Sequence, residues 1–232
     1  ERLGGKVIEA KEISKTYDVK PILRDFSLLV NRGDRVALLL PQAPQTAIAH
    51  LAAYKLGAIA VPLAALFGLE ALRYRLTDSG AKGLVTDTAG LAKLTEIRDD
   101  LPGLDLVVCV DGPETGVADF DTMLSAASDS FETLPSRPDD PALMIYTSGT
   151  TGQPKGVLHG HRVLAGHLPG IELSQNFLGR EGDLLWTPAD WAWAGGLLNA
   201  LFPALALGVP VICHATRKFD PEFAFRLLEQ QG

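Results

Sequence analysis

The sequence predicts an α/β fold, with mostly parallel, doubly wound sheets in αβα layers and an antiparallel β-hairpin at the amino terminus. From Asp34 onward, short apolar runs alternate with amphipathic helical segments, a pattern typical of parallel strands joined by helical crossovers. These runs are apolar throughout, as strands covered on both faces are. Before Asp34, two segments alternate polar and apolar residues, as hairpin strands do.

The individual elements follow from the same patterns. Hairpin strands are expected at residues 7–17 and 21–30. The other strands are predicted at residues 36–40, 58–62, 83–86, 106–110, 142–146, 156–159, 184–187 and 209–213. Helices are predicted at residues 45–56, 69–79, 92–100, 120–127, 161–177, 195–207 and 221–231. Asp220 is the expected N-cap of the last helix, and Pro221 its first residue.

A stretch rich in Ser, Asp and Pro interrupts the alternation at residues 128–141 and predicts a joint between subdomains. We therefore expect a hairpin region over residues 1–33 and a larger α/β region over residues 34–232 that contains the joint. The charge also changes near this boundary. Residues 1–36 carry eight Lys/Arg and six Asp/Glu (+2), whereas the rest carry thirteen and twenty-two (−9).

Composition narrows the class of protein. The net charge of −7 argues against a general nucleic-acid or anionic-membrane surface. Cys109 and Cys213 each lie in an apolar strand-like run, which predicts buried, reduced thiols and a cytoplasmic protein. Residues 191–213 are long and apolar enough for a membrane span, although a buried helix followed by a buried strand has the same composition. The histidines have no metal-ligand spacing, so no metal site is predicted.

The most informative stretch is residues 146–157, which read Tyr-Thr-Ser-Gly-Thr-Thr-Gly-Gln-Pro-Lys-Gly-Val. Its glycines would let backbone N–H groups converge on anionic oxygens, its hydroxyls would add donors, and Lys155 would supply a positive charge. This composition suits an oligophosphate, and a polar hairpin turn is the alternative. No Walker A pattern occurs in the chain.

This stretch, with Leu-His-Gly-His after it, resembles the phosphate loop of the adenylate-forming superfamily, which includes acyl-CoA synthetases. Residues 187–196 (Thr-Pro-Ala-Asp-Trp-Ala-Trp-Ala-Gly-Gly) resemble the segment that lines the acyl pocket of acetyl- and medium-chain acyl-CoA synthetases. The two motifs stand in the family's order. The resemblance covers residues 34–232.

The resemblance implies a two-step reaction in which a carboxylate and ATP give acyl-AMP, and CoA then takes the acyl group. It implies ATP and Mg²⁺ as cofactors, and a short- or medium-chain carboxylate and CoA as partners. Phosphate-binding residues would be Thr147, Ser148, Gly149, Thr150, Thr151, Gly152 and Lys155. Acyl-pocket residues would be Trp191, Trp193, Gly195 and Gly196, with core packing as the alternative for both tryptophans.

The family's later adenine- and ribose-binding segments and its catalytic lysine would lie beyond Gly232. We therefore expect no catalytic residue within the sequence, and little or no activity from this portion by itself. Two other functions stay open. The chain is either a noncatalytic α/β module with at most weak nucleotide binding, or an assembly domain that forms homo-oligomers through exposed apolar surface or a strand edge.

The first thirty-three residues depart from the family, which is normally helical there. The alternating segments at residues 7–17 and 21–30 are similar to the first strands of ABC-F type ABC ATPases. Both families can contain Arg-Gly-Asp-Arg-Val, found here at residues 32–36, so we hypothesise a chimera joined near this string. A divergent synthetase amino terminus is the alternative.

Overall fold

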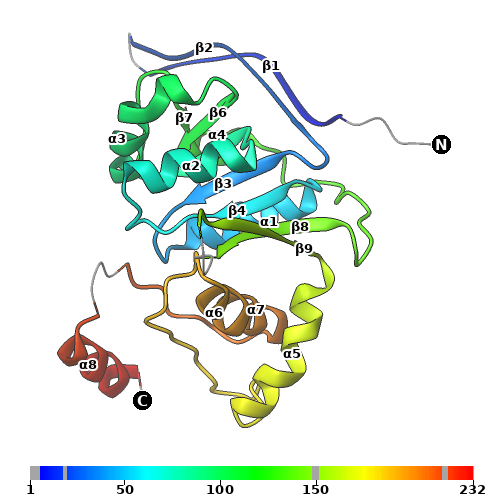
Figure 1. Cartoon of the computed structure of the whole chain (residues 1–232), viewed down its shortest axis with the longest axis vertical. Coiled ribbons are helices and arrows are strands. Elements are labelled where there is room, and N and C mark those ends of the chain that lie inside the picture. Colours follow the sequence, from blue (N-terminus) through cyan, green and yellow to red (C-terminus); the bar gives the residue numbers. More distant parts are fainter. Residues whose placement is uncertain (1–5, 18–19, 148–151, 216–218, 232) are drawn as a thin grey trace.

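A seven-stranded sheet forms the centre of the structure, a computed structural model that describes residues 6–17, 20–147, 152–215 and 219–231, with side chains from Val30 onward. Its strand order is β7-β6-β5-β3-β4-β8-β9 (Figure 1). The strands are β3 (Arg35–Leu39), β4 (Ile59–Pro62), β5 (Gly83–Thr86), β6 (Leu106–Cys109), β7 (Ala118–Asp119), β8 (Pro141–Thr147) and β9 (Lys155–Gly160). Strands β3 to β8 pair in parallel, whereas β9 runs antiparallel to β8. The predicted mostly parallel sheet is confirmed.

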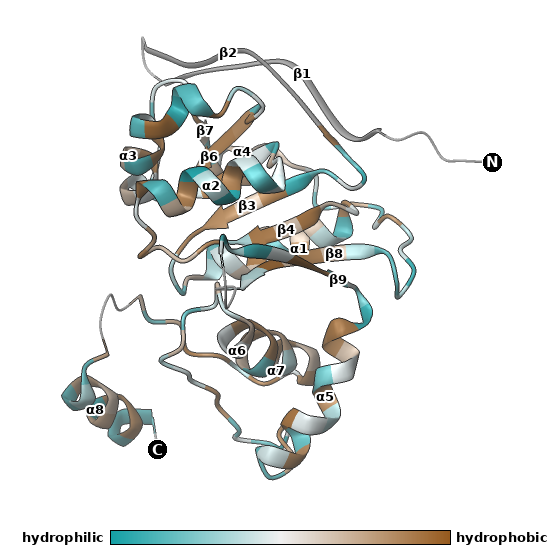
Figure 2. Ribbon diagram, in the orientation of Figure 1, coloured by the Kyte–Doolittle hydropathy of each residue, from teal (hydrophilic) through white to brown (hydrophobic). Residues whose placement is uncertain are grey.

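Helices cover both faces of this sheet, which gives the predicted αβα layers. On one face, Leu38 of β3 shares a core with Ala49 and Ala53 of α1 (Pro44–Lys55). On the other, its neighbours Ala37 and Leu39 pack with α2 (Leu69–Ser79) and α3 (Thr88–Ile97). Because successive residues of a strand point to opposite faces of the sheet, β3 contributes side chains to both hydrophobic cores. Figure 2 shows the resulting brown, apolar strands between helices of mixed hydropathy.

The carboxyl-terminal half adds helices against the α1 face. It contains α5 (Arg162–Ser174), α6 (Ala194–Gly196), the π-helix η2 (Leu197–Leu201) and α7 (Phe202–Leu207). Leu197, Leu201 and Phe202 join the same core as α1. Smaller elements are α4 (Phe120–Ala126) and the 3₁₀-helix η1 (Arg98–Asp100), and α8 (Pro221–Gln231) lies at the edge of the molecule (Figure 1).

A buried aromatic and imidazole cluster joins α1 to this half. His50 is fully buried, with Nδ1 3.1 Å from the Tyr54 hydroxyl and its ring 5.3 Å from that of Phe202. The Tyr54 ring lies 5.9 Å from that of His161, which precedes α5. Burial lowers the pKa of His50 to about 3, so this imidazole is neutral at physiological pH.

The predicted amino-terminal hairpin is confirmed as β1 (Lys6–Tyr17) and β2 (Lys20–Asn31), which pair antiparallel in a separate sheet. A turn then leads into β3. There the Asp34 carboxylate accepts hydrogen bonds from the backbone N–H (2.7 Å) and side-chain amide (3.3 Å) of Asn31, and Gly33 has a φ of +84°. A left-handed φ favours glycine at this position.

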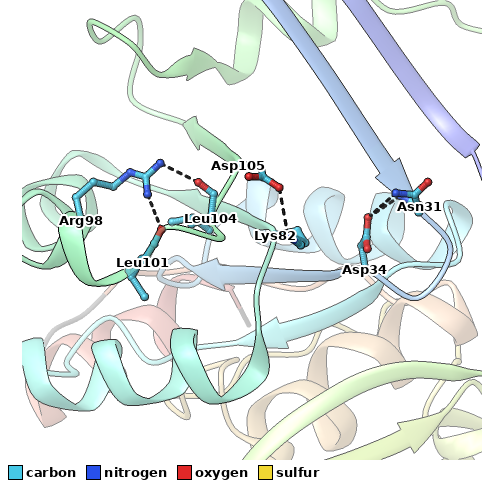
Figure 3. A network of polar contacts seen from close by, with 7 residues as sticks. All are labelled: Asn31, Asp34, Lys82, Arg98, Leu101, Leu104 and Asp105. Atoms are coloured by element: carbon cyan, nitrogen blue, oxygen red, sulfur yellow. Dashed lines mark hydrogen bonds and ion pairs between the residues drawn. The ribbon is translucent and has the colours of Figure 1, made fainter.

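Polar contacts also fix the connections at the amino ends of β5 and β6 (Figure 3). Lys82, just before β5, lies 3.5 Å from the carboxylate of Asp105, just before β6. Arg98 in η1 donates to the carbonyls of Leu101 (2.7 Å) and Leu104 (2.8 Å). The loop that returns the chain from α3 to β6 is therefore held by a side chain of its own helix end.

Two sequence-based predictions are wrong. Residues 184–187 and 209–213 are not strands, because they meet only at an isolated bridge between Leu185 and Val211. Pro210 lacks the N–H that a longer ladder would need. Cys109 is buried as expected, but Cys213 is exposed.

The apolar stretch at residues 191–213 does not form a single helix along its whole length. It forms α6, η2, α7 and irregular segments. Within the described ranges, every helix is too short or too polar to cross a membrane.

Candidate functional site

The glycine- and hydroxyl-rich stretch connects the antiparallel strands β8 and β9. Thr147, the last residue of β8, is paired in register with Lys155, the first of β9, and both are exposed. Gly152 has a φ of +116° with open space around it. The candidate residues Ser148, Gly149, Thr150 and Thr151 lie outside the described residues. The sheet therefore brings Thr147, Gly152 and Lys155 to one end of an edge hairpin.

Helix α2 forms hydrogen bonds with both arms of this hairpin. The hydroxyl of Tyr146, beside Thr147, donates to the Asp78 carboxylate at 2.6 Å. The hydroxyl of Tyr74 donates to the carbonyl of Pro154 at 2.9 Å. Burial and the hydrogen bond to Asp78 both raise the pKa of Tyr146, so its proton stays on the phenol. Helix α2 thus contacts the candidate phosphate loop at its first residue, Tyr146, and at Pro154, beside Lys155.

The two candidate acyl-pocket tryptophans occupy different environments. Trp191 is 2% exposed and belongs to the core shared with α1, which is the packing alternative for this residue. Trp193 is 41% exposed, and its ring meets the ring of Phe67 edge-on at 5.8 Å. Only Trp193 of the two therefore presents an indole surface to a small molecule.

The two candidate glycines also differ. A Cβ on Gly196 would lie 2.4 Å from the carbonyl oxygen of Asp190 and 2.8 Å from that of Ala189. Such distances leave no space for a side chain, so glycine is required by packing. Gly195 is exposed, and its Cβ would meet open space.

A cavity of about 500 Å³ opens at the carboxyl ends of β3, β4 and β5. Loops leave β3 toward α1 on one face and leave β4 and β5 toward α2 and α3 on the other, which is where open α/β sheets bind ligands. The lining combines apolar residues such as Leu39 and Leu66 with Asp87, Lys93, Asp190 and His214.

Two charged groups of this cavity, Lys93 and Asp190, already form hydrogen bonds with the backbone. Lys93 donates from Nζ to the carbonyls of Ala65 (2.7 Å) and Phe67 (3.0 Å). Burial raises the pKa of Asp190, although a hydrogen bond from the backbone of Ala192 partly opposes the shift. The cavity therefore suits a mainly apolar organic group with a few polar contacts.

Gln42 lines the cavity and connects the loop after β3 to residues of the carboxyl-terminal half of the chain. Its side-chain amide donates to the carbonyls of Thr187 (3.0 Å) and Ala189 (2.6 Å), and its oxygen lies 3.4 Å from the backbone nitrogen of His214. Gln42 is 8% exposed, so these bonds are formed away from water.

Sequence reasoning did not identify Gln42, Asp87, Lys93 or His214 as site residues. A signal for Gln42 and Asp87 was present, because each follows a predicted strand whose carboxyl end meets the same edge of a parallel sheet, whereas Lys93 lies within a predicted helix. His214 had no such signal, since its place depends on the irregular segment at residues 212–215.

The comparisons with known proteins agree on one family. Residues 23–232 match the family described as "AMP-binding enzyme". The chain is 33% identical over 223 residues to acetyl-coenzyme A synthetase 2 of Candida glabrata, covering 87% of this chain and 32% of that protein. It is 32% identical over 206 residues to acetyl-coenzyme A synthetase of Bacillus subtilis, covering 88% and 35%.

Among solved structures, the chain is similar to a Brucella canis acyl-CoA synthetase, with a TM-score of 0.75 and 33% identity, over 87% of this chain and 36% of that one. The chain thus spans about a third of the length of the relatives that it matches.

Proposed function

Because the chain belongs to the AMP-binding enzyme family, we propose that it supplies the phosphate-binding portion of an AMP-forming acyl-CoA synthetase. A carboxylate oxygen would attack the α-phosphorus of ATP, the bond to the β-phosphate would break, and acyl-AMP and pyrophosphate would form. The thiol of CoA would then attack the acyl carbonyl and release AMP. The observation that carries this proposal is the hairpin that places Thr147 opposite Lys155 at an exposed sheet edge.

In this proposal the hairpin binds the β- and γ-phosphates. Thr147, Lys155 and the stretch between them, Ser148 to Gly152, would stabilise the charge of the leaving pyrophosphate, which is the main help that a phosphoryl centre needs. Mg²⁺ would enter with ATP, bound to its phosphates.

Trp193 and Gly195 are the candidate acyl contacts that are open to a ligand, whereas Trp191 and Gly196 would act through packing. A bulky indole that contacts the acyl group favours a short- or medium-chain carboxylate. The cavity at the strand ends, with its mainly apolar lining, is the candidate space for the organic part of a substrate.

We expect the given residues alone to bind nucleotide, but only weakly. A few charge-assisted hydrogen bonds, each worth about 1.5 to 3 kcal/mol, must offset an association cost of about 4 to 15 kcal/mol. Turnover by these residues alone is not expected, and no catalytic residue is assigned.

Calorimetric titration with magnesium pyrophosphate and Mg-ATP tests the proposal. Lys155→Ala should abolish measurable binding, whereas Lys82→Ala, which removes an equally exposed lysine at the opposite end of the sheet, should leave it unchanged. Equal effects of the two variants, or no binding by the unchanged chain, would refute the phosphate site. Pyrophosphate release with a panel of carboxylates then asks whether this portion has any activity of its own.

Exposed apolar side chains favour a second candidate function, self-association of a noncatalytic module. Val157 and Leu158 on β9 are 40% and 49% exposed, and Phe225 and Leu228 on α8 are 73% and 56% exposed. The outer edge of β9 is also unpaired in the described sheet. Light scattering after size exclusion should give an oligomer that Phe225→Asp or Leu158→Asp dissociates. A monomer at all concentrations would exclude this candidate.

The hairpin at residues 1–33 remains a candidate for a separate, ABC-F-like origin, and a cytoplasmic location remains a proposal. The family match begins at residue 23, within β2, and so includes the string at residues 32–36 where the junction was hypothesised. A gene map that shows uninterrupted synthetase ancestry through the first thirty-six codons would remove the chimera.

A further inference from the structure

The guanidinium of Arg75 lies in an environment that is unusual for a charged group. Arg75 is 7% exposed, and its Cζ lies 4.1 Å from the ring centroid of Phe67 and 5.6 Å from that of Tyr146. Nη1 donates to the carbonyl of Ala71 at 2.9 Å, and Nε has no partner. No carboxylate forms an ion pair with it in the described part of the chain.

A charge held this way costs stability. Burial lowers the pKa of Arg75, while the neighbouring Tyr146 and Tyr74 oppose the shift. A leucine in the same position on α2 would avoid the desolvation cost. The arginine provides a flat cation that contacts both aromatic rings, as a leucine side chain could not.

The two rings belong to the two halves of the candidate site. Tyr146 ends the buried part of β8, one residue before Thr147. Phe67 contacts Trp193 edge-on at 5.8 Å. Phe67, Arg75 and Tyr146 therefore form a chain of contacts from the candidate acyl-pocket indole to the base of the phosphate hairpin, by which we mean β8, β9 and the stretch between them.

Neighbouring residues of α2 complete the attachment. Tyr74 bonds the carbonyl of Pro154 on the β9 side at 2.9 Å, and Asp78 accepts from Tyr146 on the β8 side at 2.6 Å. Tyr74 and Asp78 are one helical turn apart, so they lie on the same face of α2 as each other.

We propose that Tyr74, Arg75 and Asp78 are positioning residues, which set the phosphate hairpin relative to the Trp193 segment and so couple pyrophosphate binding to the acyl pocket. This inference rests on the proposed function. Tyr74 and Asp78 hold the two strands of the hairpin, and Arg75 transmits the placement to Trp193 through Phe67.

The test uses the full chain and three variants. Tyr74→Phe removes one hydroxyl, Arg75→Met removes the charge but keeps an unbranched stem, and Arg73→Met is the control on the same helix. Arg73 forms its ion pairs with Glu70 (2.9 Å) and Asp100 (2.8 Å), neither of which belongs to the hairpin. Amide hydrogen exchange and titration with magnesium pyrophosphate are measured for each.

Tyr74→Phe should speed exchange at residues 152–156 and weaken pyrophosphate binding by about 2- to 12-fold, the value of one neutral hydrogen bond. Arg75→Met should speed exchange both in β8 and β9 and at residues 190–196. Arg73→Met should change neither.

A uniform rise in exchange over the whole chain, or equal effects of the three variants, would overturn the positioning role and leave only a structural one. If the unchanged chain does not bind pyrophosphate, the proposed function fails. The exchange pattern still decides this inference, because it requires no ligand.

Discussion

Gly196→Ala is expected to destabilise the fold, although alanine is ordinarily the better residue in a helix. The new Cβ would lie 2.4 Å from the carbonyl oxygen of Asp190, so backbone must move by most of an ångström to restore an ordinary contact. Overpacking of this kind costs about 1 to 3 kcal/mol. The entropic gain of Gly→Ala, about 0.4 to 1 kcal/mol, offsets part of it. The net loss should be about 1 to 2 kcal/mol.

Gly195→Ala provides the matched control, because its Cβ would meet open space and only the entropic gain remains. Thermal unfolding followed by circular dichroism should show Gly196→Ala melting about 2 to 8 °C lower and Gly195→Ala about 1 to 4 °C higher. Urea unfolding with shifted midpoints and unchanged m-values would show that both variants change the free energy of unfolding without changing the surface exposed. Equal melting temperatures for the two variants would refute the close approach of Gly196 to Asp190.

Three further predictions concern buried polar groups. His50 has a pKa of about 3 in the folded chain, against about 6.5 when unfolded. Its contribution to the free energy of unfolding, about 3 to 5 kcal/mol, is therefore present above pH 6.5 and lost as pH falls toward 3. His50→Phe should make the free energy of urea unfolding nearly independent of pH between these values. The pKa of Asp190 is raised in the folded chain, so its contribution to the free energy of unfolding is present below about pH 3.9 and lost as pH rises through the folded pKa. Asp190→Asn should remove that loss in urea unfolding. Gln42→Ala removes two part-buried hydrogen bonds and should cost about 1 to 3 kcal/mol in thermal unfolding, whereas Gln153→Ala on the exposed hairpin should cost almost nothing.

Periodicity predicted β3, β4, β5, β6 and β8 because each is a short apolar run bounded by turn residues, whereas it missed the two-residue strand β7, Ala118–Asp119. The strand at residues 83–86 and the helix at 69–79 match the predicted bounds, and the helix predicted from residue 92 begins at Thr88, where Asp87 caps it. Propensity gave no sign of that earlier start, since Gly90 lies within the first turn. A Cβ at Gly90 would lie 1.9 Å from the Thr86 hydroxyl, so glycine serves close packing of α3 on the sheet.

The same reasoning failed where hydrophobicity had two explanations. Residues 184–187 and 209–213 are as apolar as the true strands, but Pro210 and the lack of partner strands leave a single bridge between them. Trp191 and Trp193 are two positions apart in one motif, yet one is in the core and the other at the surface. A sequence motif specifies residue types and their spacing, but it does not specify burial. Trp191 is buried because it packs in the core that also contains residues of α1.

The contacts that assemble the site explain why it was only partly predictable. Gln42 and Ala189 are 147 positions apart, Tyr74 and Pro154 are 80 apart, and Asp78 and Tyr146 are 68 apart. Capping and periodicity act over a few residues, so they cannot indicate such pairs. What the strand pattern does indicate is that the carboxyl ends of β3, β4 and β5 meet at one edge, which is where the cavity lies. Each pair contributes a single hydrogen bond, a small part of the free energy of unfolding. The geometry of the site therefore depends on few interactions, and substitutions such as Tyr74→Phe should alter binding well before they unfold the chain.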